Sequence, residues 1–489
     1  MWYGSLMSRI HRADDFIGSL GIEAYRVGGS VRDEIIGRTP KDADYIVRGV
    51  DLLYLANILN TAGCKVTPIV ARDKAHLGWR TSIRGVGLVE IVLPRVERST
   101  GSGRDMEIVV DESLSLATDA KRRDFTFNAL YKGVGPGYPK TAAEGGVADP
   151  TGNGLYDLQH RMIRTTHPDS FADDPLRILR ALRFVSTLDA DLARDTEVQM
   201  YYLAQEVTGL TDKGVSGTVY DELSKLLMGQ APAKALRIAR DTGVLAVVLP
   251  ELRPMLGFDQ GSRYHDLTTD EHTFKALETA AHVNARLEVR WALLFHDAGK
   301  PETAWEGKDG RTHYYAQKGD VVDPWDGHLN IDHEEQSEWL WREAAHRLNV
   351  PKSMRDDVAR IVRDHMIPTK TKNPATRVRR MRVKYGDSLL RDLLLHRTCD
   401  LSGKGVKVAL NHIEHIAKME RLRNESERDN VPASVKDLEI NGHDAKAAGI
   451  QGRAIGSTLA RILDEVVCDP TDQTLSREWQ MTRLEALAK

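Results

Sequence analysis

Cysteine is scarce in this sequence of 489 residues, which has only Cys64, Cys399 and Cys468. They lie far apart, form no C-x-x-C pair and are odd in number, which argues against a disulfide framework and against a cysteine zinc site. Long hydrophobic runs are lacking too. No segment is apolar enough to span a membrane, and the N-terminus MWYGSLMSRIHRADD lacks the apolar core of a signal peptide. We therefore expect a cytoplasmic protein with no membrane partner.

An excess of charge of one sign is also missing. The chain has 68 Lys and Arg against 71 Asp and Glu, a formal net charge of −3 that gives no global signal for nucleic acid. Basic residues nevertheless cluster at Lys121–Arg123 and again between Arg377 and Lys384. The second cluster fits two interpretations equally well, a solvated helix face or a stripe that grips the phosphates of a folded RNA.

The pattern of hydrophobic residues predicts several domains, because a chain of this length exceeds what one core usually serves. Residues 22–135 alternate short β-type runs (IEAYRV, ADYIV, LVEIVL) with helical stretches, which is typical of a small α/β domain. From Asp149 onward the pattern is helical. A glycine- and charge-rich segment, residues 94–113, is expected to be a mobile functional loop.

A diglycine turn follows the first of these β-type runs. Gly28 and Gly29 allow the backbone to turn tightly and to approach a polyphosphate closely. Ser30 is then the expected N-cap of the helix VRDEII, whose amino end favours anions. Arg32 and Asp33 fall in its first turn. The turn therefore predicts a phosphate cradle.

Two carboxylates follow on the next run, at Asp42 and Asp44. Residues two apart on a strand share a face, so both would point into one site and bind Mg²⁺ ions, one for the attacking hydroxyl and one for the triphosphate. A lone D-x-D is more often a solvated loop, but the glycine pair and the apolar YIV favour the site. Glu90 lies in LVEIVL on an expected buried strand, as a third metal ligand or as a salt-bridge partner of an arginine.

A helical segment, FADDPLRILRALRF, carries a second set of polar residues. Pro175 suits a first helical position behind an Asp174 cap. Asp173 precedes Arg177 by four residues, so it can orient a guanidinium that reads the edge of a base. The alternative is an ordinary salt-bridged helix face.

Histidines mark the next part of the chain. An adjacent His–Asp pair at the end of an apolar helix, with further histidines elsewhere, indicates a metal phosphohydrolase centre. The candidates are His272, His296, Asp297, His333, His365 and Asp400, with His265 and His328 as further histidines nearby. Residues 303–327 are interpreted as an insertion loop.

Together these motifs resemble the bacterial-type (class II) tRNA nucleotidyltransferases, or CCA-adding enzymes, that carry an HD domain. The resemblance runs through GGSVRDEIIG, DAD, LPRVERSTGSG, KRRDFTFNAL, DPTGNGLYDLQHRMIR, DDPLRILRALRF, the histidines and NGHDAKAAGIQGRAIGSTL. It implies addition of C, C and A to the 3′ end of tRNA from CTP and ATP, with Mg²⁺ as cofactor. The implied fold is α+β: a polymerase-β-like head (residues 1–148), then a helical neck (149–250), an HD domain (251–404) and a helical tail (405–489).

The same resemblance assigns roles to residues. It makes Asp42, Asp44 and Glu90 catalytic, and it makes Asp173, Asp174 and Arg177 a protein template for the bases. The nucleotide-binding set it implies is Gly28, Gly29, Ser30, Arg32, Asp33, Arg122, Arg123, Asp124, Asn128, Asp173, Asp174, Arg177 and Arg180. The family usually has Glu at 173, and Gly217 and Thr218 stand where an Arg is usual. The retained loop at 94–113 favours a full CCA-adder.

For the HD part the resemblance implies a divalent transition metal. His272, His296, Asp297 and Asp400 match the ligand set best, and His333 and His365 are candidates for a second ion. Two other functions remain open at this point: a poly(A) polymerase of the same superfamily, and an RNA-end phosphohydrolase that uses the HD site.

Overall fold

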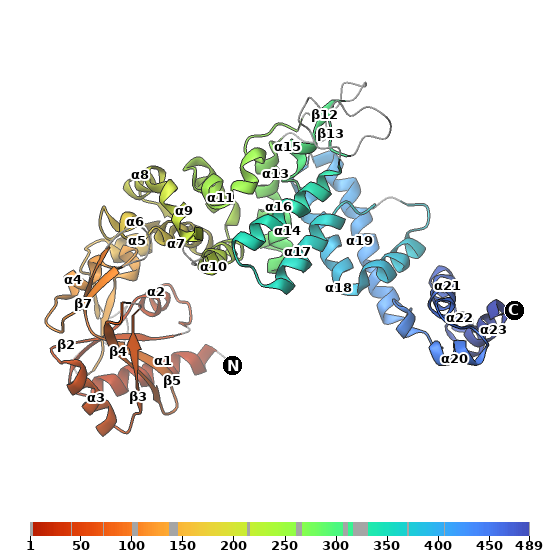
Figure 1. Cartoon of the computed structure of the whole chain (residues 1–489). Coiled ribbons are helices and arrows are strands. Elements are labelled where there is room, and N and C mark those ends of the chain that lie inside the picture. The colour runs from red at the N-terminus through yellow and green to blue at the C-terminus, as the bar shows by residue number, and fades with distance from the viewer. Residues whose placement is uncertain are drawn as a thin grey trace. The chain divides into compact units, whose positions relative to one another are not determined.

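The computed structural model describes residues 3–40, 42–71, 73–99, 106–135, 145–212, 216–260, 267–306, 312–315, 331–368, 371–404 and 406–488. The chain forms two compact units, Met1–Pro250 and Glu251–Lys489. Strands gather in the red and orange part of the first unit, and the rest of the chain is mainly helical (Figure 1). This confirms the predicted α+β fold class. The finer division into four domains stays a prediction.

The first unit is built on a seven-stranded sheet with the strand order β3-β4-β5-β2-β1-β8-β9. The strands are β1 (Glu23–Val27), β2 (Asp44–Arg48), β3 (Val66–Val70), β4 (His76–Ile83), β5 (Gly87–Val92), β8 (Tyr131–Gly133) and β9 (Val147–Ala148). The central strand β2 runs antiparallel to β1 and parallel to β5. The three predicted β-type runs are therefore three adjacent strands.

The two faces of this sheet differ because side chains alternate along each strand. Tyr45 and Val47 of β2 pack in one core with residues of α1 (Tyr3–Ser19) and α3 (Leu52–Thr61). Asp44 and Ile46 face the other way, and Ile46 packs in a second core with Ala120 and Tyr131. The alternation thus keeps Asp44 out of the α1–α3 core.

The expected loop at residues 94–113 is wrong in part. Strands β6 (Arg95–Ser99) and β7 (Met106–Val110) pair in an antiparallel hairpin, and residues 100–105 between them lie outside the described part. In a sequence, two short β-type runs separated by a few glycine and serine residues indicate a hairpin, and the charges in this segment obscured that pattern.

The remainder of the first unit is helical apart from the short pair β10 (Met162–Ile163) and β11 (Asp191–Leu192). Its further helices are α2 (Gly29–Ile35), α4 (Leu116–Lys121), η1 (Thr126–Asn128), α5 (Gly154–Gln159), α6 (Ser170–Asp173), α7 (Leu176–Leu188), α8 (Arg194–Leu203), η3 (Ala204–Val207), α9 (Thr208–Asp212), α10 (Ser216–Leu227), α11 (Pro232–Asp241), α12 (Val244–Val248) and η4 (Pro250–Met255), the last of which extends into the second unit.

The second unit consists mainly of helices. They are α13 (Thr269–His282), α14 (Leu287–Phe295), α15 (Lys300–Thr303), α16 (His333–Arg347), α17 (Lys352–Asp364), α18 (Pro374–Ser402), α19 (Val406–Arg428), η5 (Val435–Asp437), α20 (Gly442–Ala447), α21 (Ala454–Cys468), α22 (Asp472–Leu475) and α23 (Arg477–Ala488). The aromatic rings of Trp291, Phe295 and Trp341 pack together in its interior. Strands β12 (Trp305–Glu306) and β13 (Thr312–His313) fall in the predicted insertion, most of which lies outside the described part.

The second basic cluster makes contacts within the protein. Arg380 forms two hydrogen bonds with Asp464 at 2.8 and 2.9 Å, and Arg382 forms two with Asp387. Arg379 donates to the backbone carbonyl of Val467. These arginines fasten α21 to α18 and brace α18 itself. In the described part of the chain, no helix has the length and hydropathy needed to cross a membrane.

Candidate functional sites

Three carboxylates lie close together on the face of the sheet opposite the α1–α3 core. Asp44 is the first residue of β2, and it lies opposite Glu90 in the parallel register with β5. Asp42 lies just before the strand rather than in it, yet it is near enough for its negative charge to raise the pKa of Asp44. The structure therefore brings together the predicted catalytic residues Asp42, Asp44 and Glu90.

The electrostatics of this cluster suit a cation. Asp42 and Asp44 are exposed to solvent. The protein packed around the Asp44 carboxylate raises its pKa, the negative charges of Glu90 and Asp42 raise it further, and Arg123 offsets part of the rise. Crowded carboxylate oxygens are the ligands that a hard divalent cation such as Mg²⁺ prefers, so the donor set fits the predicted ion.

Glu90 is not buried as the sequence suggested. Its side chain is 37% exposed, and Arg80, its cross-strand neighbour on β4, donates to Oε1 from Nε at 2.9 Å. Burial of the apolar neighbours Val89 and Ile91 on the opposite face explains the error. The salt bridge proposed as the alternative for Glu90 is thus present, on the same side of the sheet as Asp44.

The diglycine turn opens α2 as predicted, with one correction. Gly28 is the N-cap and has φ +76°, a conformation that favours glycine. Ser30 is not the N-cap: it lies inside the first turn, is buried, and donates from its hydroxyl to the carbonyl of Val27. A Cβ at Gly28 would lie 3.6 Å from Nη1 of Arg123, so the turn passes close to that guanidinium.

A chain of polar contacts links α2 to η1 and α7. Arg32 binds Asp33 through Nε at 2.8 Å and Asn128 through Nη1 at 2.9 Å. Asn128 donates to Asp124, which also accepts two hydrogen bonds from Arg180, at 2.9 and 2.6 Å. Burial alone would raise the pKa of Asp124, but Arg180 and Asn128 hold it at about 2. Five residues predicted to bind nucleotide therefore form one network.

Asp119 is a residue that the sequence reasoning missed. It is fully buried and binds Arg122 through Nε at 2.7 Å and Arg123 at 3.2 Å. Tyr131 also donates to it at 2.7 Å, and the two arginines hold its pKa far below the usual value despite its burial. The signal was present in the sequence. An acid three residues before Arg122 and four before Arg123 shares a helix face with both arginines.

The predicted contact between Asp173 and Arg177 is absent. Asp173 instead lies 3.2 Å from His167, while Arg177 is buried and donates to Ser170 and to the carbonyl of Arg122. The helix is broken between them, because α6 ends at Asp173 and Pro175 disfavours helical backbone at the residue before it.

Asp174 behaves more nearly as the sequence suggested. Asp174 accepts the backbone N–H of Leu176 at 3.1 Å, so it does cap the start of α7. Glu222, on α10, is buried and pairs with Arg183 at 3.1 Å and with Arg180 at 3.8 Å. Arginines from α7 thus face the segment that lacks the family's usual Arg at Gly217 and Thr218.

In the second unit, the six predicted histidine and aspartate ligands come together in two buried groups. His272, His296 and Asp400 form one group and Asp297, His333 and His365 form the other. Within each group, the possible ligand atoms lie within 4.8 Å of one another. The residues come from α13, the end of α14, α16, the end of α17 and α18.

Asp297 joins the two groups. Its Oδ2 lies 3.2 Å from His296 and 3.6 Å from His272, and its Oδ1 lies 3.5 Å from His333. Although burial alone would raise its pKa, His296 and Lys300 hold the pKa of Asp297 well below the usual value. One carboxylate therefore presents an oxygen to each group.

Three of the histidines are held in a ligand-like orientation. His296, His333 and His365 each place Nδ1 against a backbone carbonyl at 2.7–3.1 Å, which turns Nε2 toward the centre. A histidine oriented this way is the usual form of a metal ligand. Nε2 of His365 is buried and has no hydrogen-bond partner, and burial lowers its pKa well below the usual value. The donor set therefore fits transition metals, for which imidazole is a favoured ligand.

His396 is a second residue that the sequence reasoning missed. Its ring is fully buried 5.2 Å from that of His296 and 5.5 Å from that of His365, and neither nitrogen has a hydrogen-bond partner. Burial lowers its pKa to about 3, so the ring is neutral. It precedes Asp400 by four residues on α18, a spacing that places both on one helix face.

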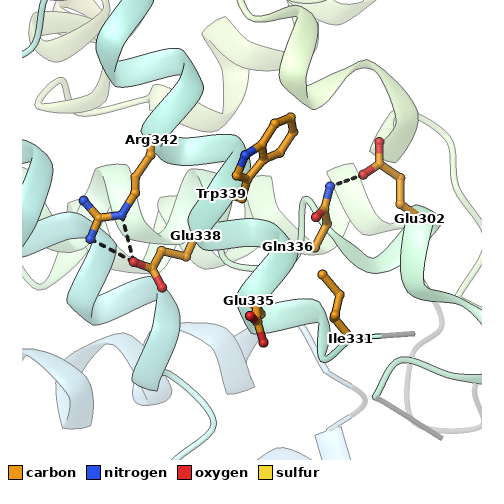
Figure 2. A pocket seen from close by; sticks show the side chains of 7 residues that line it. All are labelled: Glu302, Ile331, Glu335, Gln336, Glu338, Trp339 and Arg342. Atoms are coloured by element: carbon orange, nitrogen blue, oxygen red, sulfur yellow. Dashed lines mark hydrogen bonds and ion pairs between the residues drawn. The ribbon is translucent and has the colours of Figure 1, made fainter. Parts of the chain in front are cut away.

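A cavity of 760 Å³ lies elsewhere in the second unit, beside α16 (Figure 2). Its lining residues are Glu302, Ile331, Glu335, Gln336, Glu338, Trp339 and Arg342. Three of these residues are acidic. Arg342 forms a salt bridge with Glu338, and Gln336 donates a hydrogen bond to Glu302. None of the predicted site residues lines this cavity.

Family comparisons agree with this arrangement. Residues 24–164 match the family described as "Poly A polymerase head domain", residues 219–256 match "Probable RNA and SrmB- binding site of polymerase A", and residues 269–409 match "HD domain". The nucleotidyltransferase and HD families are metal-dependent.

Individual proteins are similar as well. The chain is 36% identical to a "Multifunctional CCA protein" of Nitrosococcus oceani over 58% of its own length and 64% of the relative's. It is 34% identical to that of Dechloromonas aromatica over 68% of its own length and 71% of the relative's. In fold it is similar to the Thermotoga maritima CCA-adding enzyme solved with tRNA, with a TM-score of 0.58, 18% identity and coverage of 98% and 95% of the two chains. The chain therefore belongs to the family of bacterial-type CCA-adding enzymes that carry an HD domain.

Proposed function

We propose that this protein adds C, C and A to the 3′ end of tRNA, using CTP and ATP. The observation that carries the proposal is the carboxylate cluster of Asp42, Asp44 and Glu90 on the face of the sheet opposite the α1–α3 core. Its position beside the Gly28 turn supports a site for a triphosphate and divalent cations. Relatives described as multifunctional CCA proteins support the reaction, and the T. maritima enzyme was solved with tRNA.

In this proposal Asp42 and Asp44 hold Mg²⁺, with Glu90 as the third carboxylate. Bound Mg²⁺ would favour deprotonation of the tRNA hydroxyl and neutralise charge that develops on the triphosphate. Arg123 lies at the Gly28 turn, where its guanidinium can bind a phosphate oxygen. The terminal hydroxyl of the tRNA then attacks the α-phosphate in line, and pyrophosphate leaves.

Nucleotide selection falls to the segment around α6 and α7. The network of Arg32, Asn128, Asp124 and Arg180 fixes α2 against α7, so the phosphate turn and the selecting segment keep one geometry. Asp173 has a side chain 35% exposed and supplies the acceptor for a base. Arg177 is held by backbone carbonyls at the same junction.

The test is incubation of the protein with tRNA that lacks its 3′ CCA, together with labelled CTP and ATP. Wild type should incorporate both nucleotides and Asp42→Ala should incorporate neither. The rival is a poly(A) polymerase of the same superfamily, which would extend tRNA with ATP alone into long tails. Addition of a single A only after two C residues would support CCA addition.

A second activity is favoured by the buried histidine centre: hydrolysis of phosphate esters at RNA ends. The two groups that share Asp297 support a centre for two divalent transition-metal ions. Such ions would activate a water molecule, which attacks the phosphorus atom of the ester at the RNA end. Opening of an RNA 2′,3′-cyclic phosphate by water to a terminal phosphomonoester, lost in His296→Ala and kept in Asp42→Ala, would establish this activity apart from CCA addition. A cytoplasmic location remains a prediction from the cysteine pattern.

A further inference from the structure

Two carboxylates of the histidine centre each contact cations as well as histidines. Asp400 turns Oδ1 toward His272, at 2.9 Å, while its Oδ2 accepts from Arg397 at 2.6 Å and lies 3.3 Å from Nζ of Lys404. Asp297 accepts from Lys300 at 2.6 Å through Oδ2, the oxygen that also faces His296. Sequence reasoning singled out none of these three basic residues.

The cations outnumber the acids that they contact. Lys300, Arg397 and Lys404 carry three positive charges against the two of Asp297 and Asp400. The nearby Glu334 lies beside His333, at 3.1 Å from Nδ1. Divalent ions bound by the histidine groups would add further positive charge. An uncompensated buried charge is costly, so the loaded centre calls for an anion.

The three cations also lie at the rim of the centre. Their side chains are 8–12% exposed and that of His333 is 8% exposed, whereas those of Asp297, Asp400, His272 and His296 are 0–3% exposed. The Nε of Arg397 is buried and has no hydrogen-bond partner. Ammonium and guanidinium groups are donors only, and phosphate oxygens are acceptors, so an arriving phosphate would satisfy this rim.

We propose that Lys404, Arg397 and Lys300 form the phosphate-binding rim of the histidine centre, where they hold the phosphate group of the substrate against the metal ligands. The proposal rests on the second activity proposed above and names the part of the substrate that is recognised. It assigns two neighbours of Asp400 to specificity: Arg397, one turn earlier on α18, and Lys404, just after the end of that helix. The phosphate belongs to an RNA end or to a free nucleotide.

The test uses the full chain loaded with Mn²⁺ or Co²⁺ and inorganic phosphate as the probe in isothermal titration calorimetry. Lys404→Gln should weaken phosphate binding by about tenfold or more, the loss expected for a charge-assisted hydrogen bond. Lys404→Arg keeps the charge and should retain most of the binding. Lys275→Gln is the matched control, because Lys275 is a lysine of α13 that is 48% exposed and pairs with Glu278.

Bound metal, measured by mass spectrometry, and thermal unfolding show whether each variant keeps an intact centre. If Lys404→Gln does not fold, Arg397→Gln takes its place. Competition of phosphate with an RNA 3′-phosphate, an RNA 2′,3′-cyclic end and a mononucleotide identifies the source. Unchanged phosphate affinity in a metal-loaded Lys404→Gln protein, or no phosphate binding by loaded wild type, would overturn the proposal.

The outcome also separates this inference from the activity on which it rests. Phosphate binding that depends on Lys404, without hydrolysis of any RNA end, supports the rim and removes the hydrolase proposal. Hydrolysis of an RNA end with the same KM in wild type and Lys404→Gln supports the hydrolase proposal and removes the rim.

Discussion

The two candidate sites of this chain differ in exposure and in ligand chemistry. The sheet site offers carboxylate oxygens on a face where Asp42 and Asp44 are open to solvent. The histidine centre is buried, and imidazole nitrogens outnumber carboxylates in it. Oxygen ligands suit Mg²⁺, and imidazole suits transition metals. We infer that ions at the sheet site exchange with the solution during turnover, whereas those of the histidine centre belong to the folded protein.

The largest effect should come from removing an oxygen ligand at the sheet site. Asp44→Asn should lower nucleotide incorporation by about 10³-fold or more, since stabilisation by the metal contributes several kcal/mol to the transition state. Asp51→Asn is a matched control, because Asp51 caps α3 and asparagine caps equally well. Single-turnover rates with labelled CTP measure both variants. An Asp44→Asn rate within tenfold of wild type would contradict the account.

Removal of transition metal should destabilise the folded protein far more than removal of Mg²⁺, because the two sites differ in ligands. A transition metal at 1,000 times its Kd should stabilise the folded protein by about 4 kcal/mol through the histidine centre. Mg²⁺ should stabilise it much less, because the buried centre offers mainly nitrogen. Thermal unfolding of chelator-treated protein with Mn²⁺, Co²⁺ or Mg²⁺ added back measures this. His365→Ala should reduce the stabilisation by transition metal. Equal stabilisation by Mg²⁺ would contradict the proposed difference between the two sites.

Acid should weaken the network that positions the sheet site. The pKa of Asp124 is about 2, below its ordinary value, so its contribution is complete above about pH 4 and is lost as pH falls through 2. The shift corresponds to about 2 kcal/mol of unfolding free energy at neutral pH. Asp124→Asn should therefore be less stable than wild type at pH 7, with a smaller difference at pH 3. Denaturant unfolding at both values measures the difference, and a constant gap would contradict the electrostatic cause.

The smallest stability effect should follow from Asp173→Ala. The Asp173–His167 pair is partly exposed, and such pairs contribute about 0–1 kcal/mol. Base selection should change more than stability does, with more misincorporation of A in place of C. Competition between CTP and ATP on tRNA ending before CCA measures the ratio. His167→Ala serves as the comparison, and unchanged selectivity in Asp173→Ala would remove this residue from the template.

Local sequence patterns predicted much of the fold and of both sites. The β-type runs ADYIV and LVEIVL predicted two strands, and the structure pairs them in parallel with Asp44 opposite Glu90. The His–Asp pair and four further candidate ligands were found because their types are unusual on otherwise apolar helices. These features depend on residues near one another in sequence, or on chemistry that has few alternatives.

Contacts set by tertiary packing were harder to predict. The break at Pro175 separated Asp173 from Arg177 although their spacing fits a helix. Asp119 and His396 lay at helical spacings from residues already singled out, but burial and partners decide their roles, and these depend on distant elements. The exposure of Glu90 depended on which sheet face the other elements cover.

The most direct test of the central claim is sequencing of tRNA 3′ ends after incubation with the protein, Mg²⁺, CTP and ATP. The tRNA begins without its terminal CCA, and a parallel reaction contains Asp44→Asn. The account predicts that wild type leaves ends that read CCA and stop, and that the variant leaves the ends unextended. Runs of A, or extension that persists in Asp44→Asn, would contradict it.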